Sequence, residues 1–307
     1  YRVDEQGVCS DKRDAALGIM QVSKDTSFPA ALESVVGDWL SAGETQIIMS
    51  GMIGSRQGWL EVPYVQCPVT EREITEGKRE VTWDGHRATI VPGLACRGPS
   101  GVVDVMRGEE TQILGAMSAL GDGEHLVCLP GTHSKWVAIR HRRLVSFSTH
   151  MTGELFALLK QHSILGRLMS DPSPGTNTAA LDEYFDKGVV RAREPGGLLH
   201  HIFGVRAEGL FSKLPPEAAS HYLSGLLIGH EIVSVQPNPR MIIPLLGAAA
   251  LAARFIGALL RVHEPIGDVR HEAVPDDTAL GILSDALQEL GRFDEAAGTS
   301  SADAAAE

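Results

Sequence analysis

The sequence predicts an α/β protein built from two lobes. Its 307 residues, 43% of them hydrophobic, are enough to bury two compact cores. A short buried strand over residues 46–49 ends in a glycine-containing loop, an order that is typical of ligand loops in open α/β sheets. The second half opens with three strands in succession and a long amphipathic helix, which indicates a second lobe with its own sheet.

Composition and charge limit the kinds of partner. The formal net charge is -12, which argues against nucleic acid and anionic membrane, because both require a basic face. We therefore expect small-molecule ligands. No apolar run approaches the roughly 20 residues of a membrane span and no signal peptide is recognisable, so we expect a soluble cytoplasmic protein. The four cysteines form no C-x-x-C pair, which argues against structural zinc: Cys9, Cys67, Cys96 and Cys128.

The first expected lobe covers residues 1–121. Residues 1–6 alternate like a strand, which we interpret as the second strand of a hairpin whose first strand would precede Tyr1. Apolar residues recur at helical spacing over residues 28–40, with Ser27 as the cap before a proline.

Two further strands are predicted over residues 81–83 and 88–91, separated by an Asp-Gly turn. The Gly/Pro/Ser-rich residues 97–103 are expected to form a loop. A helical pattern then runs to Leu120, and we place the boundary between the lobes just after it.

The second expected lobe covers residues 122–295. Its three strands are predicted over residues 125–129, 135–139 and 144–148, with a helix beginning near Gly153, and this order is that of an RNase H-like lobe. The remaining predictions are helices at 218–235, 249–260 and 278–290, a buried strand at 241–246, and a disordered tail at 296–307.

Two motifs about twenty positions apart suit phosphoryl transfer. After Gly108, Glu109 or Glu110 can deprotonate an acceptor hydroxyl, while the Gly131–Thr132 turn exposes amides that hold phosphate. Each motif alone also has a structural explanation, because acidic residues favour helix starts and a Gly-Thr turn is common in hairpins.

Three motifs follow one another in the chain: Met106-Arg107-Gly108-Glu109-Glu110-Thr111-Gln112, Pro130-Gly131-Thr132-His133-Ser134-Lys135-Trp136-Val137 and Met151-Thr152-Gly153-Glu154-Leu155. Their order resembles that of the 2-dehydro-3-deoxygalactonokinase family, and the resemblance covers nearly the whole chain. That family is similar to the actin/hexokinase-like sugar kinases, so the resemblance implies two RNase H-like lobes with a cleft between them. It also implies ATP, Mg²⁺, and phosphorylation of 2-dehydro-3-deoxy-D-galactonate at its 6-position in galactonate degradation.

The resemblance also assigns roles on the acceptor side. Glu109 matches the catalytic base position, and Glu110 is the alternative if the helix slips by one residue. Arg107 is expected to bind the substrate carboxylate, although an ion pair with a neighbouring glutamate would also explain it. The loop expected to meet the sugar hydroxyls contains Ser50, Gly51, Met52, Gly54 and Ser55.

The nucleotide is expected in the second lobe. A glycine turn at Gly247 and Ala248 would let the backbone approach the nucleotide, and the following helix would point its positive end at the phosphates. Gly225 is expected to form another wall of the adenine slot, although helix packing would also explain glycines here. The hairpin residues expected to contact ATP are Gly131, Thr132, His133 and Lys135.

One departure from the family pattern is the lack of an Asp-x-Gly-Thr/Ser loop near Tyr1, so the metal ligands are left unassigned. We expect that loop upstream of Tyr1. The alternatives are a kinase of another keto-deoxy sugar acid or polyol, and a non-catalytic sugar-acid or nucleotide sensor on the same fold. The sequence leaves open whether the chain forms a homodimer.

Overall fold

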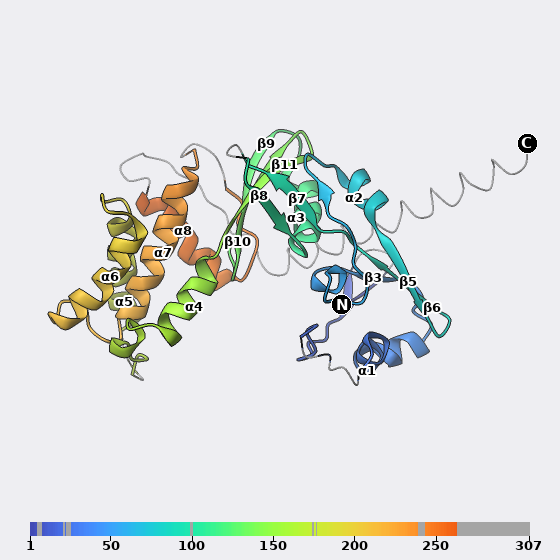
Figure 1. Cartoon of the computed structure of the whole chain (residues 1–307), viewed down its shortest axis with the longest axis horizontal. Helices are drawn as coiled ribbons and strands as arrows, with labels where there is room; N and C mark the ends of the chain where they lie inside the picture. The colour runs from blue at the N-terminus through green and yellow to red at the C-terminus, as the bar shows by residue number, and fades with distance from the viewer. Residues whose placement is uncertain are drawn as a thin grey trace, which may run out of the picture. The chain divides into compact units, whose positions relative to one another are not determined.

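The computed structural model describes residues 1–4, 8–20, 22, 26–98, 101–173, 175, 177–238 and 243–262 (Figure 1). It confirms the α/β class, with mixed sheets and many helices. Two compact units are present, the first formed by Tyr1–Glu124 and Ile139–Phe147, the second by His125–Ala138 and the described chain from Ser148 onward. The boundary expected after residue 121 lies close to the point where the chain passes from unit 1 to unit 2, at residues 124–125. Residues 139–147, which were expected in the second lobe, belong to unit 1.

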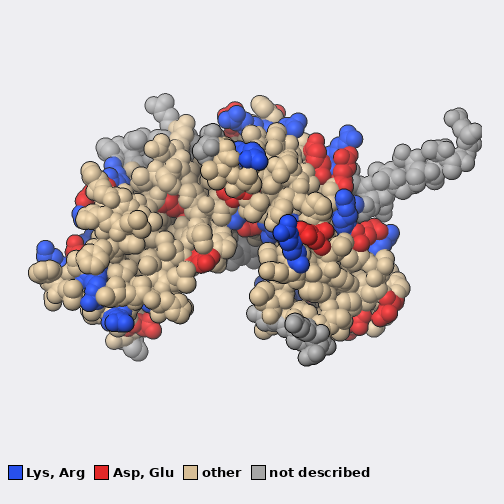
Figure 2. Space-filling view, in the orientation of Figure 1, with Lys and Arg blue, Asp and Glu red and all other residues tan. Residues whose placement is uncertain are grey.

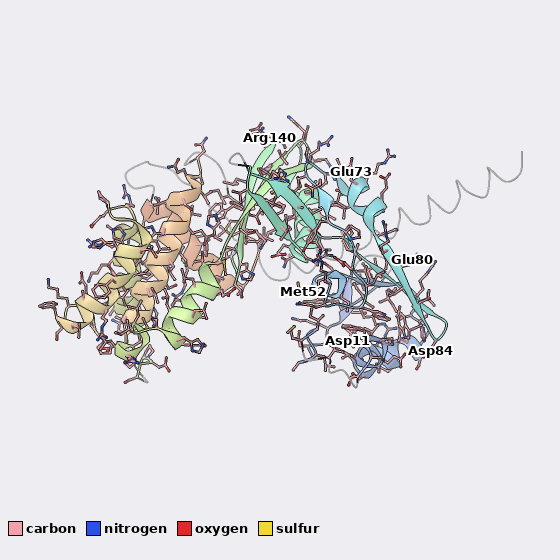
Figure 3. The ribbon with its side chains drawn as sticks, viewed as in Figure 1. Asp11, Met52, Glu73, Glu80, Asp84 and Arg140 are labelled. Carbon is pink, nitrogen blue, oxygen red and sulfur yellow. The ribbon has the colours of Figure 1, made fainter. Side chains whose placement is uncertain are left out.

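The first sheet of unit 1 has the order β3-β6-β5, formed by Ile47–Met49, His86–Ile90 and Arg79–Trp83. β3 is parallel to β6, and β5 is antiparallel to it. Asp84, labelled in Figure 3, and Gly85 both have positive φ angles, of 42° and 82°. These values confirm the turn that the Asp-Gly pair predicts between the two strands.

The second sheet of unit 1 has the order β4-β7-β8, formed by Val65–Gln66, Leu94–Arg97 and Val103–Met106. The loop predicted over residues 97–103 is therefore shorter than expected, because strands β7 and β8 enter it from both sides. Helix α2, Glu71–Gly77, is likewise absent from the sequence prediction. It starts at a capping box in which Thr70 and Glu73 satisfy each other's backbone groups.

Three more elements complete unit 1. Helix α1, Phe28–Ser41, begins as predicted, with the Ser27 hydroxyl accepting from the Ala30 amide. Helix α3, Glu109–Leu120, also agrees with the sequence prediction. At the chain start, β1 (Arg2–Val3) pairs antiparallel with β2 (Cys9–Asp11), the segment that follows it in the sequence.

The three strands predicted after residue 124 are present as β9 (Glu124–Leu129), β10 (Ser134–Arg140) and β11 (Arg143–His150). Their order in the sheet is β11-β10-β9. Helix α4, Thr152–His162, follows directly, as expected. The boundary between the two units runs through these strands.

The rest of unit 2 is helical, and helix α7 lies at its centre. α7, Ala219–Val235, packs against α4, α5, α6 and α8 (Figure 1). The buried residues of α7 are nearly all apolar, and Leu223, Leu226 and Ile232 are fully buried. The surrounding helices are α5 (Thr178–Ala192), α6 (Gly197–Leu210) and α8 (Ala249–Val262).

Some predicted elements lie outside the described residues, namely the helix at 278–290, the tail at 296–307 and the first residues of the strand at 241–246. In the described part of the chain, no helix has the length and apolar character that crossing a membrane would need. Acidic and basic side chains are interspersed on the face that Figure 2 shows.

Candidate functional site

Two segments far apart in the sequence meet in unit 1. The loop after β3 reaches the start of α3, where the Ser50 hydroxyl donates to Glu110 Oε1 at 3.1 Å. Gly108 has a φ of 118°, and a β-carbon added to it would lie 3.3 Å from the Gly51 α-carbon. We call residues 50–55 together with residues 107–110 the acceptor cluster. The structure thus brings together the residues expected to bind the sugar acid and both candidate bases.

Glu110 is the deeply buried member of the acceptor cluster. Its side chain is fully buried, and the Gly108 amide donates to its Oε2 at 2.6 Å. Burial raises the pKa of Glu110 to about 7, and its hydrogen bonds to backbone amides and to Ser50 oppose that rise. One carboxylate oxygen therefore joins the Ser50 loop to α3, and the other holds the backbone at the start of α3.

Glu109 differs from its neighbour in exposure. The side chain is only partly buried, and its Oε2 accepts from the Arg107 amide at 3.2 Å. Both glutamates belong to the first turn of α3, where a negative charge is favoured by the helix dipole. One step along a helix thus separates a partly buried carboxylate from a fully buried one.

Arg107 is held by backbone and by an aromatic ring. Its Nη2 donates to the Val62 carbonyl at 2.7 Å, and the guanidinium lies 4.3 Å from the centre of the Tyr64 ring. Its Nε and Nη1 are buried without a hydrogen-bond partner among the described residues. The alternative explanation, an ion pair between the guanidinium and a neighbouring glutamate, is therefore not what holds this side chain.

The remaining residues of the Ser50 loop form a short 3₁₀ turn, Met52–Gly54. Gly54 is buried, and a β-carbon there would lie 2.8 Å from Arg107 Nη1, so only glycine leaves the guanidinium its place. The Met52 side chain, labelled in Figure 3, is 50% exposed, and the Ser55 hydroxyl accepts from the Gln57 amide.

The hairpin turn between β9 and β10, residues 130–133, is seated on the start of α4. The Glu154 amide donates to the Thr132 carbonyl at 3.0 Å. A β-carbon on Gly153 would lie 2.6 Å from the Gly131 carbonyl oxygen, so the turn can approach only because residue 153 is glycine. His133 hydrogen-bonds Glu154 through its exposed ring.

The second glycine turn lies beside this hairpin turn. Gly247 has a φ of 155°, and a β-carbon on it would be 3.3 Å from the Pro130 carbonyl oxygen. The chain before Gly247 runs next to β9, since the Leu246 amide donates to the Cys128 carbonyl at 2.9 Å. α8 begins at Ala249, just after Ala248. The residues predicted to bind nucleotide at 131–132 and 247–248 are thus neighbours within unit 2.

Two other residues predicted to bind nucleotide have different surroundings. Lys135 is buried, with 3% exposure, and its Nζ donates to the His133 carbonyl at 3.3 Å. Gly225 lies where α7 crosses α5, and a β-carbon on it would be 2.0 Å from the Phe185 carbonyl oxygen. Helix packing accounts for Gly225, so our nucleotide site does not include it.

The sequence prediction missed one buried polar group near the hairpin turn. Glu231 on α7 accepts hydrogen bonds from Trp136 Nε1 at 2.7 Å and from the Thr152 hydroxyl. A glutamate within an otherwise apolar helix could have drawn attention to this position, but its partners are far away in the sequence. The described residues contain no group of three or more acidic, histidine or cysteine side chains that could hold a metal ion.

A mixed α/β fold, a carboxylate and arginine cluster in one unit and paired glycine turns in the other are together typical of a small-molecule kinase. Comparison with known proteins makes the class specific. The chain belongs to the 2-keto-3-deoxy-galactonokinase family, whose family model matches residues 1–278. This match confirms the resemblance found in the sequence.

Individual relatives agree with the family match. The chain is 37% identical over 260 residues to a Rhizobium meliloti (strain 1021) protein named "Probable 2-dehydro-3-deoxygalactonokinase", covering 84% of this chain and 83% of the relative. It is 35% identical over 249 residues to the 2-dehydro-3-deoxygalactonokinase of Escherichia coli (strain K12), covering 80% of each. A crystal structure of a Sinorhizobium meliloti protein assigned as a 2-dehydro-3-deoxygalactonokinase superposes with a TM-score of 0.80 at 34% identity, covering 94% of both chains.

Proposed function

We propose that this protein is an ATP-dependent kinase that converts 2-dehydro-3-deoxy-D-galactonate to its 6-phosphate during galactonate breakdown. Its family and the names of its relatives support this activity. The observation that carries the proposal is the acceptor cluster, because it joins an arginine with unpaired N–H groups, two carboxylates and a glycine loop in one place. These are the groups that a hydroxylated acid acceptor requires.

Arg107 is proposed to bind the carboxylate of the sugar acid. Its buried Nε and Nη1 have no acceptor among the described residues, and an unpaired buried donor is costly. A substrate carboxylate would supply a charged acceptor, and arginine suits this group better than lysine. The Tyr64 ring and the Val62 carbonyl would keep the guanidinium in place before substrate arrives.

Glu109 is proposed as the general base, and Glu110 as the residue that fixes the loop against α3. A base must reach the hydroxyl proton, and Glu109 is partly exposed whereas Glu110 is fully buried with both oxygens engaged. The pKa of Glu110, raised by burial to about 7, would suit proton transfer and keeps it as the alternative. We choose Glu109 because it is the more exposed of the two glutamates, and the variants Glu109→Gln and Glu110→Gln test this choice.

The nucleotide is proposed to bind unit 2 at the hairpin turn and the Gly247 turn. Backbone amides of Gly131 and Thr132, with the Thr132 hydroxyl, would hold phosphate oxygens, and Lys135 would add a positive charge. Gly247 and Ala248 would admit the nucleotide close to the start of α8, where the helix dipole favours an anion. His133 belongs to the same hairpin turn and is also proposed to contact the nucleotide.

Mg²⁺ is proposed to accompany ATP, where it would neutralise charge on the phosphates during transfer. We assign it no protein ligands.

We further propose that the two units correspond to the two lobes of an actin/hexokinase-like kinase, since transfer requires acceptor hydroxyl and γ-phosphate to meet. ATP-dependent sugar-acid breakdown and the free thiols of Cys96 and Cys128 favour the cytoplasm as its location.

The experiment that tests this function measures ATP consumption by the purified chain with a panel of aldonates, 2-keto-3-deoxyaldonates and polyols. We expect 2-dehydro-3-deoxy-D-galactonate to give the highest kcat/KM, and omission of Mg²⁺ to abolish turnover. A clear preference for another acceptor would refute the proposed substrate. Stabilisation by ligands without turnover of any acceptor would instead indicate a sensor.

A further inference from the structure

A buried carboxylate lies behind the hairpin turn of unit 2. Glu231 belongs to the central helix α7, and only 3% of its surface is exposed. Burial raises the pKa of Glu231, so its position carries a cost unless hydrogen bonds compensate it. Nearly every other buried residue of α7 is apolar. The contacts of Glu231 must therefore compensate for the burial of its carboxylate.

The carboxylate of Glu231 joins the strand that follows the hairpin turn to the helix against which the turn packs. Its Oε1 accepts from Trp136 Nε1 at 2.7 Å, and Trp136 lies on β10, which leads away from the turn. Its Oε2 accepts from the hydroxyl of Thr152, the first residue of α4. These partners are 95 and 79 residues away in the sequence.

The same start of α4 is the seat of the turn itself. Gly153 follows Thr152 and lies against Gly131 and Thr132, and the Glu154 amide donates to the Thr132 carbonyl. A shift of Thr152 would therefore move the residues that touch the turn. Ser134, at the start of β10, is on the same face of the strand as Trp136. The buried Ser134 hydroxyl lowers the pKa of Glu231 and so favours its ionised form. The hydroxyl makes no hydrogen bond of normal geometry to a described residue.

We infer that Glu231 is a positioning residue for the nucleotide phosphates, because its carboxylate joins β10, which follows the Gly131–Thr132 turn, to the start of α4, which contacts that turn. The inference rests on the proposed nucleotide site. A phosphate-binding turn gains affinity when its amides are held in place before the ligand arrives, and supporting hydrogen bonds from behind provide that order. Glu231 reaches the phosphates only through Trp136, Thr152 and the turn.

The test measures the affinity of purified, full-length variants for MgADP by isothermal titration calorimetry, which needs no sugar acid. In Glu231→Gln, the amide keeps the volume of the side chain but loses one acceptor oxygen. We expect its Kd for MgADP to rise about tenfold, as for loss of a hydrogen bond to a charged group. Thr152→Val and Trp136→Phe each remove one donor to Glu231, and we expect smaller rises in the same direction.

The matched control is His230→Gln, one position earlier on α7. His230 hydrogen-bonds His201 on α6 at 3.0 Å, so this variant perturbs the same helix without touching the turn. We expect it to lower the melting temperature but to leave the Kd for MgADP unchanged. With active enzyme, Glu231→Gln should raise the KM for ATP and not the KM for the sugar acid.

The outcomes separate this inference from the proposed function. MgADP affinity equal to wild type in folded Glu231→Gln, or an equal loss in His230→Gln, would overturn the positioning role. If Glu231→Gln does not fold, Thr152→Val and Trp136→Phe decide, and wild-type affinity in both would overturn it. If the wild type binds MgADP yet phosphorylates no keto-deoxy acid, the proposed substrate fails and the role of Glu231 stands.

Discussion

The hydroxyl of Ser50 donates a hydrogen bond to the carboxylate of Glu110, a residue 60 positions later in the sequence. This contact connects the loop after β3 to the first turn of α3. It explains how a glycine loop, an arginine and two glutamates come to form one cluster.

Replacement of Glu109 by glutamine should lower kcat by about 100- to 10,000-fold, the usual contribution of a positioned general base. The KM for both substrates should change little, because the side chain keeps its size. Steady-state kinetics of Glu109→Gln and Glu110→Gln, side by side, provide the measurement. Near-normal kcat in Glu109→Gln with a large loss in Glu110→Gln would reverse the two roles.

Replacement of Arg107 by lysine should raise the KM for the sugar acid roughly tenfold or more, because an ammonium cannot reproduce the guanidinium's hydrogen-bond geometry. The KM for ATP should stay the same. Arg72→Lys is the matched control, since Arg72 is exposed and forms an ion pair with Glu76 along α2. A selective rise in the KM for ATP would show that Arg107 serves the nucleotide instead.

Stability should depend on pH through Glu110. Its pKa is raised by burial from 4.5 to about 7 in the folded protein, so the folded state binds the proton more tightly than the unfolded state. This stabilising contribution is fully present below the unfolded pKa and is lost as the pH rises through about 7. Urea unfolding of wild type and Glu110→Gln at several pH values from 4 to 8 should show a flatter dependence in the variant. The same slope in both proteins would contradict this assignment.

Replacement of Gly153 by alanine should weaken ATP binding, because its β-carbon would lie 2.6 Å from the Gly131 carbonyl oxygen and displace the turn. We expect the KM for ATP to rise about tenfold, as for a binding group moved out of position. Gly204→Ala is the control in another helix of unit 2, where nothing lies within 4 Å of the added carbon. Unchanged ATP kinetics in folded Gly153→Ala would show that this turn does not bind the phosphates.

Local rules were sufficient for the elements whose ends are marked by particular residues. Ser27 before Pro29 correctly predicted the start of α1, and Asp84-Gly85 the turn between β5 and β6. Strands β7 and β8 were not predicted, because each has only 4 residues and such short strands show too little alternation to be recognised. Helix α2 has only 7 residues and is defined mainly by the Thr70 and Glu73 capping box.

The candidate site was predictable in its parts and not in its contacts. The motifs containing Glu109 and Thr132 were visible because their residue types suit phosphoryl transfer. Which glutamate is buried was not, since both follow Gly108 and only the packing of α3 distinguishes them. Glu231 was missed because its partners Trp136 and Thr152 come from other elements, and no local pattern connects such distant residues.

The most direct test of the central claim identifies the product formed by the purified protein from MgATP and 2-dehydro-3-deoxy-D-galactonate. Phosphorus–proton correlation NMR of that product should connect the new phosphate to the two protons on carbon 6. A phosphate on any other carbon, or hydrolysis of ATP without a phosphorylated sugar acid, would contradict the account.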